Sequence, residues 1–142
     1  MPITWDDLEC SMTGERHEAD QVHGLSRAGW PLLARYDLEG VHRALTREAL
    51  AGRPMDLWRY RELLPVRQAR SIASLGEMAT PVVALHKSAK RLGLSTLLVK
   101  DEGRLPTGSF KARGVALAVS MAKELGVRKI AMPTNGNAGA AL

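Results

Sequence analysis

The chain has 142 residues, 45% hydrophobic and 25% charged, which fits a single globular domain. The net charge is +5, but the basic residues are scattered and only three Trp, two Tyr and one Phe are present, which argues against a nucleic-acid-binding surface. The single cysteine excludes an intrachain disulfide. No apolar run is long enough for a membrane span. The first ten residues lack the apolar core of a signal peptide. We therefore expect a cytoplasmic protein with neither a membrane nor a nucleic-acid partner.

The amino-terminal part of the chain contains few regular elements. Residues 1–35 are the least regular, although 31–38 has the pattern of an edge strand. Residues 41–51 have apolar side chains at helical spacing. Gly52 and Pro54 follow this pattern directly, so we predict one helix that ends there.

Strands and helices are predicted to alternate from residue 82 onwards. The predicted elements are a strand over 82–85, a helix over 86–92, a strand over 97–100, a helix over 109–125, a strand over 129–132 and a helix from 138. Ser109 is a suitable N-cap for the long helix, and Gly126 is a suitable C′ residue. Strand, helix and strand in succession predict a right-handed βαβ unit in a parallel sheet. Because ligands bind at the carboxyl ends of such strands, we expect the loops 101–109 and 133–137 to converge on one ligand.

Lys111 lies in the first turn of the predicted long helix. The helix macrodipole disfavours a cation there by roughly 0.3–1 kcal/mol, and it favours the neutral amine that a Schiff-base-forming lysine uses. The alternative is a side chain that simply points into water. A phosphate-binding P-loop does not fit, because Gly103 and Gly108 are correctly spaced but Ser109 stands where that motif needs its lysine.

Three segments with distinctive sequences occur between residues 57 and 142. Residues 57–81 contain LWRYRELLP and SLGEMATP, residues 100–114 read KDEGRLPTGSFKARG, and residues 133–139 read PTNGNAG. In this order they resemble the lead-in, the cofactor-lysine segment and the asparagine loop of the fold-type II pyridoxal-phosphate enzymes, in particular the threonine synthase family. The resemblance implies an α/β protein that begins a tryptophan synthase beta-like fold, with a parallel sheet of βαβ units. We predict an amino-terminal segment over 1–56 and an incomplete catalytic domain over 57–142.

The resemblance implies that pyridoxal 5′-phosphate is the cofactor and assigns three residues to it. Lys111 would form a Schiff base with the cofactor and move protons once the substrate displaces it. Phe110 would pack on a face of the pyridine ring, although a role as an ordinary core aromatic is the alternative. Asn137 would donate a hydrogen bond to the 3′-oxygen of the cofactor.

The resemblance also implies a site for the substrate carboxylate. Thr134, Asn135 and Gly136 would offer hydroxyl, amide and backbone donors to it. Arg113 is expected to orient the helix start, to meet an anion, or to form an ordinary surface salt bridge.

The implied reaction converts O-phospho-L-homoserine and water to L-threonine and phosphate. Serine/threonine dehydratase is the alternative enzyme, and a non-catalytic truncated module is the alternative that involves no catalysis. Because the glycine-rich phosphate loop of the family has no counterpart before Leu142, we expect an amino-terminal fragment that is inactive alone. A homo-oligomer is expected for the complete enzyme.

Many threonine synthases carry a zinc ribbon near the amino terminus. Its four ligand positions correspond here to Cys10, Thr13, Leu25 and Ala28, and only the first can bind zinc. His17 and His23 match neither ligand pair in spacing. We therefore predict a degenerate ribbon remnant without metal.

Overall fold

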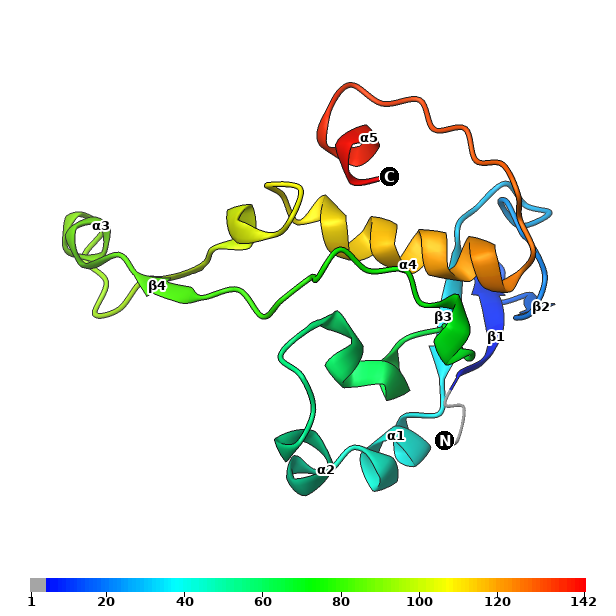
Figure 1. Cartoon of the computed structure of the whole chain (residues 1–142), viewed down its shortest axis with the longest axis horizontal. Helices are drawn as coiled ribbons and strands as arrows, with labels where there is room; N and C mark the ends of the chain where they lie inside the picture. The colour runs from blue at the N-terminus through cyan, green and yellow to red at the C-terminus, as the bar shows by residue number, and fades with distance from the viewer. Residues whose placement is uncertain (1–4) are drawn as a thin grey trace.

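The computed structural model describes residues 5–142 and shows a mixed α/β chain. Figure 1 shows helix α4 across the middle of a body, from which an arm projects to one side. The strands are β1 (Trp5–Cys10), β2 (Arg16–Glu18), β3 (Leu32–Tyr36), β4 (Val82–Ala84) and β5 (Leu98–Lys100). The α-helices are α1 (Leu38–Ala44), α2 (Arg47–Ala51), α3 (His86–Arg91), α4 (Lys111–Glu124) and α5 (Asn137–Ala141). Three short 3₁₀ helices are η1 (Leu57–Leu63), η2 (Ala69–Ser71) and η3 (Glu102–Arg104).

The first three strands form an antiparallel sheet in the order β2-β1-β3. Gly14, with φ of 73°, lies in the tight turn between β1 and β2, where a residue with a Cβ would be strained. Because β3 comes last in the order β2-β1-β3, it is an edge strand, as predicted for 31–38. The sequence pattern gave no indication of β1 or β2.

The segment 65–68 connects this sheet to α4 through three hydrogen bonds. The indole N–H of Trp5 donates to the carbonyl of Pro65 at 2.8 Å. Arg67 and Gln68 follow Pro65 closely in the chain. Their backbone N–H groups donate to the carboxylate of Glu124, in the last turn of α4, at 2.9 and 2.7 Å. An acidic residue in the last turn opposes the helix dipole, and these two amides compensate for that placement.

The single helix predicted over 41–51 is wrong, because the chain forms α1 and α2 instead. Thr46 has an extended backbone, and its hydroxyl accepts the N–H of Ala49 at 3.1 Å. A threonine that caps a new helix start cannot continue the helix before it, so the apolar spacing alone was misleading. The carboxylate of Asp37 caps α1 in the same way, by accepting the N–H of Gly40 at 2.8 Å.

Strands β4 and β5 pair with each other, and α3 connects them. The pairing is antiparallel, and residues 129–132 form no strand, so the prediction of a parallel βαβ unit is wrong for residues 5–142. A strand needs a neighbour that satisfies its backbone N–H and C=O groups, and no strand lies beside 129–132 in this part of the chain. The predicted strands 82–85 and 97–100 and helix 86–92 are confirmed within a residue or two.

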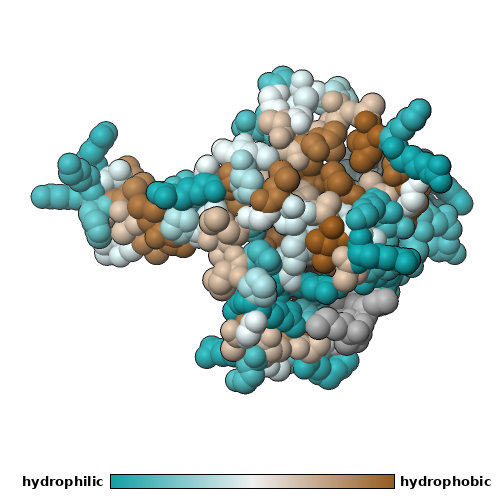
Figure 2. Space-filling model, in the orientation of Figure 1, coloured by the Kyte–Doolittle hydropathy of each residue, from teal (hydrophilic) through white to brown (hydrophobic). Residues whose placement is uncertain are grey.

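Residues 82–100 form the arm seen in Figure 1. Hydrophobic side chains lie open along it, as the brown surface in Figure 2 shows, with Val82 and Leu98 each 57% exposed. None of the helices within residues 5–142 is long and apolar enough to cross a membrane.

The structure gives no support to a zinc-ribbon remnant in the first sheet. The thiol of Cys10 donates a hydrogen bond to the hydroxyl of Ser26 at 3.0 Å, and it accepts the N–H of Thr13 at 3.4 Å. These bonds lower the pKa of the Cys10 thiol to about 7. Within the described part of the chain, no group of three or more His, Cys, Asp or Glu residues could hold a metal ion.

Candidate active site

Lys111 is the first residue of α4, as the sequence predicts for the long helix. Gly108, with φ of 68°, turns the preceding loop, and the hydroxyl of Ser109 accepts the N–H of Lys111 at 3.2 Å. The helix starts at residue 111 rather than 109, although Ser109 still satisfies one of its first amides. At the other end Gly126 adopts φ of 74°, and the N–H of Val127 bonds the carbonyl of Ala122 at 2.8 Å, which confirms the predicted C′ glycine.

The side chain of Lys111 is exposed. Its Nζ lies 4.7 Å from the ring centroid of Phe110, in a cation–π contact. Phe110 is itself 61% exposed, so the alternative that it is a core aromatic is wrong. Within residues 5–142 the ammonium of Lys111 forms no ion pair and no hydrogen bond, and it is therefore available to a ligand.

The asparagine loop over 133–137 is held in shape by Thr134. Its hydroxyl accepts the N–H groups of Gly136 and Gly139 at 3.1 and 3.0 Å. Gly136 has φ of 155° and ψ of −115°, a conformation that is essentially restricted to glycine. A Cβ on Gly139 would lie 2.2 Å from Cγ2 of Thr134, so a side chain there would collide with the loop.

Asn135 and Asn137 are both exposed. Within the described residues neither side-chain amide has a hydrogen-bond partner. Helix α5 packs against α4, above the half of α4 that begins with Lys111 in Figure 1. No hydrogen bond joins Lys111 to any residue of 134–137 in this structure. Lys111 and Asn137 therefore begin two helices that pack against each other.

A network of charged and polar side chains surrounds the start of α4. The guanidinium of Arg113 donates to both carboxylate oxygens of Glu102, from Nε at 2.6 Å and from Nη2 at 2.9 Å. Thr80 donates its hydroxyl to the same carboxylate, and Lys100 donates from Nζ to the carbonyl of Thr80 at 2.7 Å. The hydrogen bonds from Arg113 and then Thr80 lower the pKa of Glu102 to about 2, and Glu102 in turn raises the pKa of Arg113.

The sequence pointed to Arg113 but not to its partners. Glu102 was visible only as part of a charged run after a strand, and Thr80 only as part of a lead-in motif. A bond between residues 11 or 22 positions apart depends on how the segments fold together, so no local pattern could have found it.

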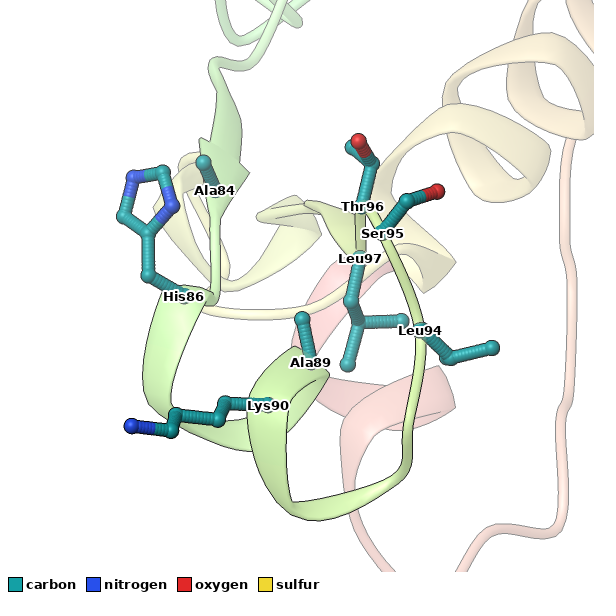
Figure 3. Close-up of a pocket in the computed structure, with 8 residues that line it drawn as sticks. All are labelled: Ala84, His86, Ala89, Lys90, Leu94, Ser95, Thr96 and Leu97. Carbon is teal, nitrogen blue, oxygen red and sulfur yellow. The ribbon is translucent and has the colours of Figure 1, made fainter.

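Lys111 lines neither of two hollows in the described part of the chain. Figure 3 shows the first, on the arm, where Ala89 and Leu97 approach each other and His86 and Lys90 point outwards. The second lies between the loop 72–77, α4 and α5, and it contains Glu77, which is 1% exposed. None of the residues predicted for the cofactor or the substrate lines either hollow.

Comparisons with known proteins relate most of this chain to pyridoxal-phosphate dependent enzymes. Residues 73–142 match the family model described as pyridoxal-phosphate dependent enzyme. The chain is 38% identical over 133 residues to a threonine synthase of Methanocaldococcus jannaschii, covering 94% of this chain and 33% of that protein. It is 35% identical to the threonine synthase of Methanosarcina acetivorans, covering 95% and 33%, and 44% identical to that of Halalkalibacterium halodurans, covering 61% and 26%. No solved structure gives a significant match.

The family match covers the segments that carry Lys111 and the asparagine loop. The chain spans 33% of the length of the two archaeal relatives. The family match begins at residue 73, before the arm, and runs to residue 142, so it includes both motif loops and all of α4. Residues 73–142 of this chain therefore belong to the family of pyridoxal-phosphate dependent enzymes.

Proposed function

We propose that this chain carries the lysine-bearing part of a threonine synthase-like active site, with Lys111 as the residue that bonds covalently to pyridoxal 5′-phosphate. The observation that supports this most directly is the place of Lys111. It begins a helix after a glycine-turned loop, it is exposed, and no anion within residues 5–142 neutralises it. The helix macrodipole disfavours a cation at a helix start, so a lysine gains no stability from this place.

The residues around Lys111 fit the cofactor. An exposed primary amine is the group that reacts with an aldehyde, and the open aromatic ring of Phe110 beside it offers a flat surface to a pyridine ring. The free side-chain amide of Asn137 is a suitable donor to a ring oxygen. When bound, the cofactor supplies an electron sink that stabilises negative charge developing on the substrate. The protein's part is to hold the amine of Lys111 where it accepts and returns protons.

For the substrate carboxylate we propose the loop of Thr134, Asn135 and Gly136. Asn135 offers an unpaired amide that points to solvent. The N–H of Gly136 is bonded to the hydroxyl of Thr134 at 3.1 Å, so its use as a donor to substrate requires that bond to open. When that bond opens, the hydroxyl of Thr134 also becomes free to bind the substrate carboxylate. Thr134 would then hold the loop before substrate binds and contact the substrate afterwards.

The proposed reaction is that of the relatives, all named threonine synthase. O-phospho-L-homoserine would lose phosphate from its γ-carbon, and water would then add at the β-carbon to give L-threonine. The proposed location is the cytoplasm, and the proposed partner is the amino-acid phosphate, with a homo-oligomer for the whole enzyme.

Borohydride trapping tests the role of Lys111. The chain is incubated with pyridoxal 5′-phosphate, reduced, digested and mapped by mass spectrometry. We expect the reduced label on Lys111, its loss in Lys111→Ala, and its retention in Lys123→Ala, a matched change of an exposed lysine on the same helix. Label spread over the lysines according to their exposure would show that Lys111 is an ordinary surface residue.

Product analysis then tests the substrate. Release of phosphate together with threonine from O-phospho-L-homoserine supports the threonine synthase proposal. Release of ammonia from serine or threonine, with no phosphate from O-phospho-L-homoserine, would assign the protein to the dehydratases instead.

A further inference from the structure

Three segments that are distant in sequence meet at the Glu102–Arg113 pair. Glu102 follows β5, Arg113 lies in the first turn of α4, and Thr80 ends the loop that leads into β4. Arg113 also donates to the carbonyl of Met78 at 2.9 Å, so its guanidinium bonds two of the three segments by itself. Glu102 in turn accepts a hydrogen bond from the hydroxyl of Thr80, which lies in the same segment as Met78.

This pair differs from an ordinary surface salt bridge. An exposed pair contributes about 0–1 kcal/mol, because both side chains lose freedom and water competes for them. Here both side chains are only 24% exposed, and the guanidinium binds the carboxylate through two nitrogen atoms. Thr80, the third member, is 5% exposed. A bidentate, partly desolvated contact of this kind fixes the relative orientation of the two side chains.

The position of Lys111 depends on the first turn of α4. Its own side chain has no polar partner within residues 5–142, so its amine is placed by the backbone that carries it. The loop before it contains Gly108, which leaves that loop easy to deform. The nearest side chain of this turn that is bonded to the rest of the protein is that of Arg113, two residues further on.

We propose that Glu102, Arg113 and Thr80 form a positioning clamp that fixes the start of α4, and with it the amine of Lys111, against the end of β5 and the loop 77–80. The clamp residues do not touch substrate or cofactor; they act through the helix start. The consequence for Lys111 rests on the proposed function, whereas the mechanical coupling of the three segments does not.

Amide hydrogen exchange of the cofactor-free chain tests the coupling. Removing one partner of a charged hydrogen bond is expected to increase local opening roughly tenfold or more. We expect Glu102→Gln and Arg113→Gln to lower protection over 77–80 and 111–116 together. The matched control is Arg104→Gln, which removes a more exposed pair of 2.8 Å with Asp101 in the same loop. Unchanged protection in the two clamp variants, or an equal loss in the control, would overturn the clamp.

Trapping with pyridoxal 5′-phosphate tests the consequence for Lys111. The readout is the ratio of label on Lys111 to label on Lys123 in the same molecules, because a general loss of folding alters both sites. We expect this ratio to fall by roughly tenfold in the clamp variants and to stay at the wild-type value in Arg104→Gln. A wild-type ratio in a variant whose exchange has increased would show that the clamp does not position the amine. If wild-type chain shows no preference for Lys111, the proposed function fails, and the exchange result still decides the coupling.

Discussion

The backbone N–H of Ala73 donates a hydrogen bond of 2.9 Å to the hydroxyl of Ser120, although 47 residues separate them in sequence. Ser120 is 0% exposed, and its hydroxyl also donates to the carbonyl of Ala116 at 2.7 Å. The bond connects the middle of α4 to the segment with which the family match begins. Ser120 therefore holds the helix of Lys111 against the lead-in segment, together with Glu124 and Arg113.

We predict that Ser120→Ala lowers the free energy of unfolding by about 1–3 kcal/mol, because the N–H of Ala73 loses its acceptor in a partly buried place. Urea denaturation followed by circular dichroism measures the change. Ser88→Ala, an exposed serine of α3, is the control and should change it by no more than about 0.5 kcal/mol. Equal effects of the two changes would mean that the buried bond contributes nothing specific.

The pair of Arg53 and Glu62 provides a second prediction. Arg53 donates to both oxygens of Glu62 at 2.7 and 2.8 Å, and the side chain of Glu62 is 5% exposed. Arg53 lowers the pKa of Glu62 through these bonds.

We expect Glu62→Gln to lower the free energy of unfolding by about 1.5–3 kcal/mol, because it removes charged hydrogen bonds and leaves Arg53 incompletely paired. Denaturant titration at neutral pH gives the value. Glu39→Gln breaks the exposed pair with Arg43 and should have an effect within about 0.5 kcal/mol. A similar loss in both variants would contradict the importance of burial.

Local features of the site were predictable from the sequence. The apolar spacing that ends before Gly126 gave the extent of α4 within two residues at each end, and Gly108 with Ser109 gave its start. The place of Lys111 in the first turn followed from these signals alone, because helix spacing and turn residues act over a few neighbouring positions.

Features that depend on distant partners were not predictable. Residues 129–132 have the composition of a strand, but no neighbouring strand within residues 5–142 pairs with them, and the pattern cannot report that. Two parallel strands would bring the two motif loops together, but residues 5–142 contain no such strands, and the packing of α5 on α4 is what places the second loop near α4. The hydroxyl of Thr134 accepts the N–H groups of Gly136 and Gly139, and its contact with substrate stays a prediction.

The close approach of Gly139 to Thr134 gives a third prediction. A methyl group at position 139 would lie 2.2 Å from Cγ2 of Thr134. We expect Gly139→Ala to lower the free energy of unfolding by about 1–3 kcal/mol through overpacking, with reduced exchange protection of the loop 133–137. Gly24→Ala, at a loop glycine with nothing within 4 Å, is the control.

A second change on the Gly139→Ala background tests the physical reason. Thr134→Ser removes Cγ2 but keeps the hydroxyl that binds the two amides, so the nearest remaining atom is 3.3 Å from the new methyl. The double variant should recover most of the lost stability. A double variant as unstable as Gly139→Ala alone would place the cause elsewhere than in this collision.

The depressed pKa of Glu102 predicts how stability depends on acid. Its folded-state pKa is about 2, below the usual value of 4.5, so its pairing stabilises the fold fully above pH 4.5 and is lost as the pH falls towards 2. Glu102→Gln cannot titrate, so we expect it to be less stable than wild type at pH 7 and the difference to shrink between pH 4.5 and pH 2. Urea denaturation at a series of pH values measures this. Arg104→Gln leaves Glu102 and Arg113 paired and should run parallel to wild type, whereas a constant gap between wild type and Glu102→Gln down to pH 2 would show that this carboxylate does not titrate with folding.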